Sequence, residues 1–202
     1  MRRLRAVLVL ALAALVLAGC AAQPIPHARS HHGVFVGQDL SLKTPDDWEL
    51  RAGLHRMVLM ALSPVGKDNQ QFRENLAVMA QALNPGESAR EFADRNLQAA
   101  RAALKDFREV AQGEEAGRPW AVYSHVYAGQ TLKVLACFVT HQEKGVILVF
   151  TSSEGEFPTL EPVFREVART LSFEPADRDR LKTLQEKLNK ADEEKAKLPP
   201  QK

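Results

Sequence analysis

Apolar residues along this chain form one continuous run near the N-terminus and several shorter stretches after it. Every residue from Ala6 to Ala18 is Ala, Val or Leu, and Arg2, Arg3 and Arg5 precede the run. A basic start followed by a short apolar region is the outline of a signal peptide. Because a permanent transmembrane helix needs roughly 20 apolar residues, the pattern predicts a segment that is removed.

Six later stretches have the length and composition of β-strands, rich in β-branched and aromatic residues and bounded by turn-forming ones. They are "DLSLKT" (39–44), "MVLMALS" (57–63), "ENLAVMAQ" (74–81), "WAVYSHVY" (120–127), "TLKVLACFV" (131–139) and "VILVFTS" (146–152). The last three are joined by short connections, which parallel strands do not allow. We therefore expect these three to be antiparallel neighbours.

Two amphipathic helices are predicted between and after these strands. Ser88 and Glu91 form an S-x-x-E capping box, and an apolar stripe follows it as far as Phe107. A second stripe predicts a helix from about 159 to 171, with Pro162 in its first turn, where proline is tolerated. The order β-β-β-α-β-β-β-α predicts an α+β fold, an antiparallel sheet flanked by amphipathic helices.

A third helix, highly charged, is predicted from 178 to 198. Leu181, Leu184 and Leu188 approximate the apolar stripe of a coiled coil, but the stripe is shorter than the three to four heptads that such an assignment needs. A solvated tail, docking onto the same domain and self-association with another chain all remain open.

The sequence Leu17-Ala18-Gly19-Cys20 resembles the lipobox of bacterial lipoproteins, in which the signal peptide is cut before a cysteine that carries diacylglycerol. The resemblance implies a signal peptide over 1–19 and a lipidated Cys20 that attaches the chain to the bilayer without spanning it. An ordinary secretory signal with a chance cysteine is the alternative. Ala21 and Ala22, where inner-membrane lipoproteins often have Asp, favour the outer membrane, facing the periplasm.

The remaining chain divides into a flexible tether (20–38), the α+β domain (39–174) and the charged tail (175–202). The tether is predicted from its prolines, glycines and lack of periodicity. Removing 1–19 leaves 24 basic against 25 acidic residues, a net charge of −1. This balance gives no reason to expect nucleic acid as a partner.

Two phrases, "LSLKTPDDWEL" and "FRENLAVMAQ", resemble the DcrB and PsbP-like group of small extracytoplasmic or lumenal domains. The resemblance covers roughly 39–174 and implies an α/β sandwich without catalytic chemistry or a cofactor. It also implies a role in binding or assembly, with an envelope protein as the expected partner. The charged C-terminal helix is a departure from the group.

A possible ligand face is formed by Tyr123, His125 and Tyr127, which alternate on one predicted strand and so share one side. Aromatic walls and an imidazole could orient a polar ligand. A covering helix or plain solvent exposure would account for the same pattern.

Other candidate chemistry is weaker. His27, His31 and His32 could bind zinc or copper, but their Pro- and Gly-containing surroundings favour a polar linker. Cys137 lies in an apolar strand and is expected to be a buried hydrophobe, and Ser152 lacks the G-x-S-x-G motif of a nucleophile elbow. The sequence thus predicts a non-catalytic, membrane-anchored module for binding or assembly at the bacterial envelope. A metal-delivery protein and a hydrolase with an unrecognised site are the alternatives.

Overall fold

A seven-stranded antiparallel sheet forms the centre of the computed structural model, which describes residues 33–52, 57–65 and 72–196. The strands occur in the order β3-β4-β5-β9-β8-β7-β6. Their bounds are Glu49–Ala52 (β3), Met57–Leu62 (β4), Asn75–Ala82 (β5), Arg108–Glu115 (β6), Arg118–Tyr127 (β7), Gln130–His141 (β8) and Lys144–Ser153 (β9). The fold is α+β, as the sequence predicts.

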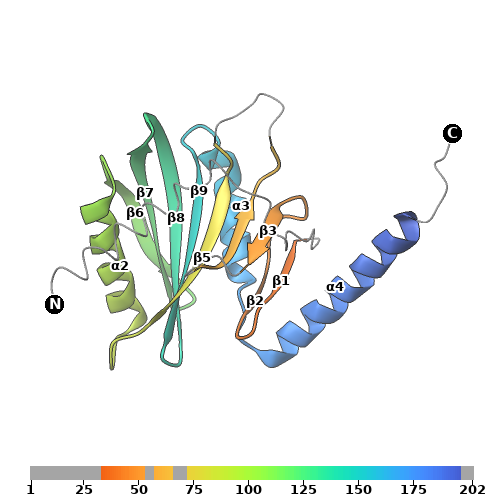
Figure 1. Cartoon of the computed structure of the whole chain (residues 1–202). Helices are drawn as coiled ribbons and strands as arrows, with labels where there is room; N and C mark the ends of the chain where they lie inside the picture. The colour runs from red at the N-terminus through yellow and green to blue at the C-terminus, as the bar shows by residue number, and fades with distance from the viewer. Residues whose placement is uncertain (1–32, 53–56, 66–71, 197–202) are drawn as a thin grey trace.

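Helices cover both faces of this sheet (Figure 1). Helix α2 (Ala89–Ala103) lies on one face, and α3 (Phe157–Arg169) lies on the other. A two-stranded hairpin, β1 (Val34–Val36) with β2 (Ser41–Lys43), adds to the α3 side. Helix α4 (Pro175–Ala196) contacts this hairpin at its beginning and then projects away from the body of the molecule.

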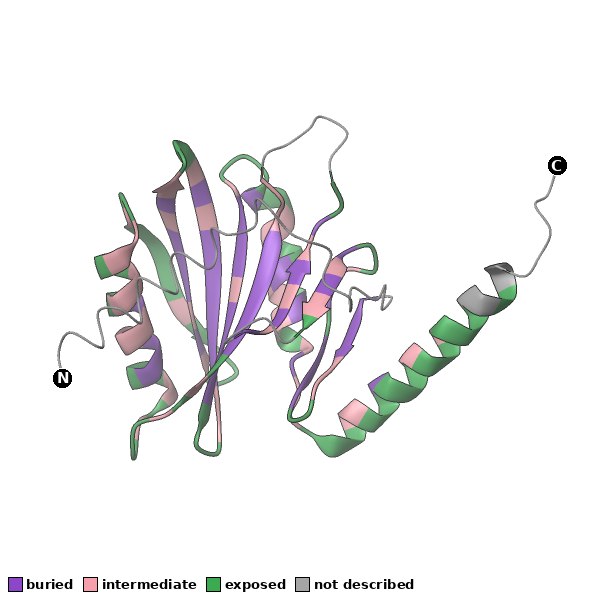
Figure 2. Ribbon diagram, in the orientation of Figure 1, coloured by how far each residue is buried: buried purple, intermediate pink, exposed green. Residues whose placement is uncertain are grey.

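The central strands are buried on both sides, which the alternation of their side chains explains. On β8, Leu135 and Cys137 face the α3 layer, whereas Ala136 and Phe138 face the α2 layer. Figure 2 shows the resulting band of buried residues through β5, β9 and β8. Because each face has its own helix, the sheet carries two hydrophobic cores, one on each side.

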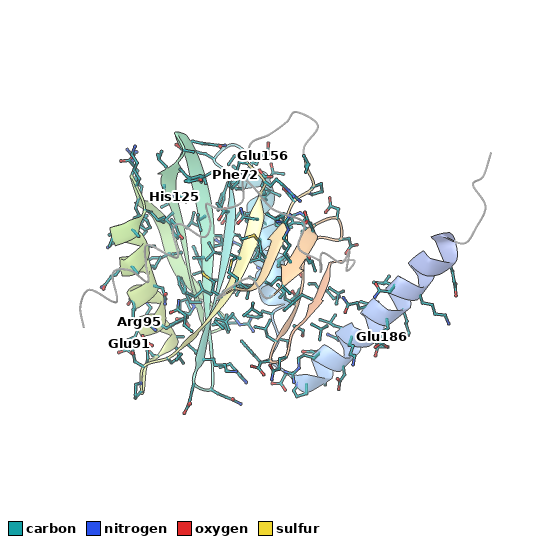
Figure 3. All side chains as sticks on the ribbon, in the orientation of Figure 1. Phe72, Glu91, Arg95, His125, Glu156 and Glu186 are labelled. Carbon is teal, nitrogen blue, oxygen red and sulfur yellow. The ribbon has the colours of Figure 1, made fainter. Side chains whose placement is uncertain are left out.

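Helix α2 begins as predicted. The Ser88 hydroxyl accepts a hydrogen bond from the backbone N–H of Glu91, and the Glu91 carboxylate accepts one from the backbone N–H of Ser88. Glu91 and Arg95 lie on the first turns of the helix (Figure 3). The helix ends at Ala103, earlier than the apolar stripe suggests, and Phe107 packs on the sheet from the following segment.

The Glu87 carboxylate joins the loop before α2 to the helix through hydrogen bonds. Arg95 donates to its two oxygens at 2.6 and 2.9 Å, and the backbone N–H of Asn84 donates at 2.8 Å. These bonds, chiefly the Arg95 guanidinium, lower the pKa of Glu87 from 4.5 to about 2. The carboxylate is thus stabilised in its charged form.

We expect the contribution of the ionised Glu87 carboxylate to the free energy of unfolding to be complete above the unfolded pKa of 4.5. It should be lost as the pH falls toward 2. The reason is that in this range the unfolded chain binds the proton more readily than the folded one. The difference in unfolding free energy between wild type and Glu87→Gln, measured in urea, should shrink from pH 7 to pH 3. A Glu87 difference that is equal at both pH values would contradict the prediction.

Three strands were not predicted, and each has a physical reason. Strand β6 is an exposed polar edge strand, so it has no apolar alternation to reveal it. Strands β1 and β3 have only 3 and 4 residues. The predicted tether over 20–38 needs correction, because Val34 and Phe35 are buried within it. The described residues begin at Gly33, and β1 follows at once.

The sequence places Pro162 in the first turn of helix α3, and that prediction is wrong. Helix α3 starts at Phe157, so Pro162 lies in its second turn. Pro158 occupies the first turn, where the missing N–H has no helical partner to lose. Among the residues that the structure describes, no helix is long and apolar enough to cross a membrane.

Candidate functional site

A pocket of about 350 Å³ opens between α3 and the strands β6, β7 and β8. We call it the α3 pocket. Its volume is at the lower end of the range for small-molecule sites, about 300–1,000 Å³. It combines an apolar surface from the sheet with charged side chains from the helix and from the β6–β7 hairpin.

The apolar side of the α3 pocket comes from strand register. Trp120 on β7 and Cys137 on β8 are direct cross-strand partners, so their side chains lie on the same face. Val139 follows two residues later on β8 and faces the same way. On the other side of Trp120 its partner is Gly113, where an added Cβ would come within 2.6 Å of the indole. Glycine at 113 therefore leaves room for the ring to lie beside β6.

The helical side of the pocket comes from one face of α3. Arg165, Ala168 and Arg169 have i, i+3, i+4 spacing and all line the pocket. The Arg165 guanidinium carbon lies 4.2 Å from the centroid of the Trp120 ring, a cation–π contact. Two nitrogens of Arg165 also donate to the Glu161 carboxylate at 2.7 and 3.0 Å. Arg165 is thus held in place by a ring and a carboxylate.

The hairpin between β6 and β7 supplies the remaining charges. Ala116 and Gly117 have φ values of 49° and 74°. Two-residue hairpin turns whose backbone twist matches that of the flanking strands require positive φ at both positions. The turn places Glu115 opposite Arg118. Glu115 accepts a hydrogen bond from Arg169 at 2.8 Å, and this bond lowers the pKa of its carboxyl group.

Arg118 is bound differently from the two helical arginines. Its guanidinium donates to the backbone carbonyls of Ala168 and Leu171 at 3.2 and 3.3 Å, at the C-terminal end of α3. Cations are favoured there by the helix dipole. Within the described part of the chain, no carboxylate forms an ion pair with Arg118.

Cys137 lines the pocket as an inert surface. Its side chain is buried, as predicted, and burial raises the pKa of the thiol to about 12. The thiol is therefore protonated at neutral pH. Because the reactive form of cysteine is the thiolate, Cys137 is unreactive there. The chemistry that the pocket offers is therefore recognition by charge, stacking and apolar contact.

The predicted ligand face on β7 lies on the opposite side of the sheet, under α2 and the segment that follows it. Tyr123 is buried and its ring centroid is 4.9 Å from that of Phe107. Burial raises the pKa of Tyr123 and lowers that of His125. His125, also buried, is labelled in Figure 3, and Tyr127 is half-buried. Tyr123 packs with residues of α2 and with Phe107 from the segment after it, which agrees with cover by a helix, one of the alternatives for this pattern. Ligand binding by this face stays a prediction.

The other predicted site residues fall outside the described residues. These are the lipidation residue Cys20 and the tether histidines His27, His31 and His32. Within the described ranges, no group of three or more His, Cys, Asp or Glu side chains could hold a metal ion.

The α3 pocket was missed because its parts are distant in sequence. One signal was present: Trp120 and Val122 share a strand face opposite the tyrosines, and Ala168 belongs to the apolar stripe of the predicted helix. Arg165 and Arg169, which flank Ala168 on the helix, also line the pocket. Nothing in the sequence indicates that the polar β6 segment joins them.

Comparison with known proteins supports the fold. No protein-family model matches the sequence, and a search of curated proteins finds no match. Among solved structures, cyanobacterial PsbP from Synechocystis sp. PCC 6803 is 13% identical, with a TM-score of 0.53, and the match covers 77% of this chain and 100% of that one. PA94 from Pseudomonas aeruginosa, a protein of unknown function, is 17% identical over 72% of this chain and 99% of its own, with a TM-score of 0.52.

A third similar structure is LpqN, which is involved in cell envelope biogenesis of Mycobacterium tuberculosis. It is 15% identical over 72% of this chain and 88% of its own, with a TM-score of 0.50. At these identities the likeness concerns the fold. The α+β fold of this chain is similar to that of PsbP, and this agrees with the fold that the resemblance in its sequence implies.

Proposed function

We propose that this protein is a non-catalytic binding module, held at the bacterial cell envelope by lipid on Cys20, and that the α3 pocket is its binding site. The observation that carries the anchor is the apolar run that ends in Leu17-Ala18-Gly19-Cys20. The destination favoured by Ala21 and Ala22 is the outer membrane, facing the periplasm. The fold shared with LpqN, an envelope-biogenesis protein, supports an envelope role.

The length of the linking segment gives this proposal a physical scale. Residues 21–32 join Cys20 to Gly33, where the described domain begins. A chain extends at most about 3.3–3.6 Å per residue, so the domain would lie within about 45 Å of the bilayer surface. The α3 pocket would therefore meet ligands or envelope proteins close to the membrane.

The anchor is tested by replacing Cys20 with serine, whose hydroxyl does not replace the thiol in lipoprotein acylation. We expect Cys20→Ser to abolish incorporation of labelled palmitate and to stop cleavage, so that only precursor is found. Cys137→Ser is the matched control, since this buried thiol should not be acylated. Equal labelling of wild type and Cys20→Ser would refute the proposed anchor.

A further inference from the structure

We infer that the α3 pocket binds a small amphiphilic carboxylate, a molecule with one anionic head and a short apolar body. The inference rests on the proposed binding role of this pocket but not on the lipid anchor. It follows from which charges in the pocket are already neutralised and from the shape of the apolar surface beside them.

The anionic head is assigned to Arg118. Arg165 and Arg169 each have a carboxylate partner, Glu161 and Glu115, at 2.7 and 2.8 Å. Among the described residues, the Arg118 guanidinium donates to backbone carbonyls, which satisfy two nitrogens but carry no full charge. A carboxylate from the ligand would supply the missing charge through charge-assisted hydrogen bonds.

The other charges limit the head to a single negative charge. Glu115 lines the same pocket and would repel a dianion. A cationic ligand is disfavoured, because Arg118 would repel it and Glu115 is already occupied by Arg169. A monoanion is the head that Arg118 can bind at the lowest electrostatic cost.

The apolar body is assigned to the sheet side of the pocket. Trp120, Val139 and Ala168 line it, and the protonated Cys137 adds a further apolar surface. Arg165 covers part of the Trp120 ring and narrows the space. With about 350 Å³ available, the body is limited to a short chain or a single ring.

The test uses the full chain, purified from membranes and held in phosphatidylcholine nanodiscs, with empty nanodiscs as the blank. Octanoate labelled with carbon-13 at the carboxyl group is titrated and its chemical shift recorded. Octan-1-ol and octylammonium, with the same chain, test the head group by competition. We expect octanoate to bind with a dissociation constant at or below the millimolar range and the two competitors to bind at least tenfold more weakly.

Three variants locate the binding. Arg118→Gln removes the head contact, and Ala168→Leu fills the pocket while keeping every charge; each should weaken octanoate binding about tenfold. Because Arg118→Gln also removes hydrogen bonds to the C-terminal end of α3, Ala168→Leu tests the pocket with those bonds intact. Arg101→Gln, an exposed arginine on α2, is the control and should leave binding within twofold.

The inference is overturned if octanoate does not bind at 10 mM, if octan-1-ol competes as well as octanoate, or if Arg118→Gln and Ala168→Leu bind like Arg101→Gln. These results are separable from those on the anchor. If Cys20 carries no lipid, the same titration in buffer still reports on the pocket. If octanoate fails while palmitate labelling of Cys20 succeeds, the anchor stands and the ligand class is wrong.

Discussion

Replacing Phe164 by alanine is expected to lower the free energy of unfolding by about 3–5 kcal/mol, the usual cost of deleting a buried aromatic side chain. Phe164 is 1% exposed and faces the sheet from α3. Its ring stacks on Phe150 with centroids 5.0 Å apart and meets the edges of Trp48 and Phe157, each at 6.3 Å. Urea unfolding of wild type and variant measures the difference.

The matched control is the preceding residue, Val163, which is 38% exposed on the same helix. Val163→Ala should change the unfolding free energy by no more than about 0.5 kcal/mol, as is usual at exposed positions. If the two substitutions cost the same, α3 is not packed on the sheet as described. The α3 pocket would then lose its helical side, so this result also bears on the proposed site.

Replacing Leu181 by alanine is expected to cost about 2–3 kcal/mol, toward the lower end for a buried leucine, because the surrounding hairpin can adjust. Leu181 is 4% exposed although it belongs to the charged helix α4. The start of α4 is further held by the Ser172 hydroxyl, which donates to Asp177 at 2.7 Å. The first part of α4 is therefore packed on the domain through β1.

Leu184, one turn further along α4 and 37% exposed, provides the control. Leu184→Ala should leave the unfolding free energy within about 0.5 kcal/mol of wild type. Equal small effects at both positions would mean that the whole helix is a separate tail, as one reading of the sequence allows. Self-association through α4 remains a prediction, and a sedimentation comparison of the same two variants would address it.

The sequence predicts those elements that carry a local signal of their own. The capping box at Ser88 and Glu91 fixes the start of α2, and the apolar residues of β7, β8 and β9 between short turns indicate strands that are buried on one or both faces. In these segments local propensity and tertiary packing favour the same structure, so the pattern is sufficient.

Elements that depend on distant partners are not visible in the pattern. The polar strand β6 is a strand because it pairs with β7, with Gly113 opposite Trp120. Val34 is buried because β2 and α4 cover it. The α3 pocket has the same origin, since Arg169 meets Glu115 only after the helix has packed on the sheet. No local spacing encodes a contact between residues so far apart.

The proposed lipid anchor on Cys20 is tested most directly by the intact mass of the chain isolated from bacterial membranes. We expect a mature chain that begins at Cys20, with the mass of residues 20–202 plus that of a diacylglyceryl group and, in hosts that add it, a third acyl chain. A chain that begins at Cys20 without lipid, or that is cleaved at another residue, would contradict it.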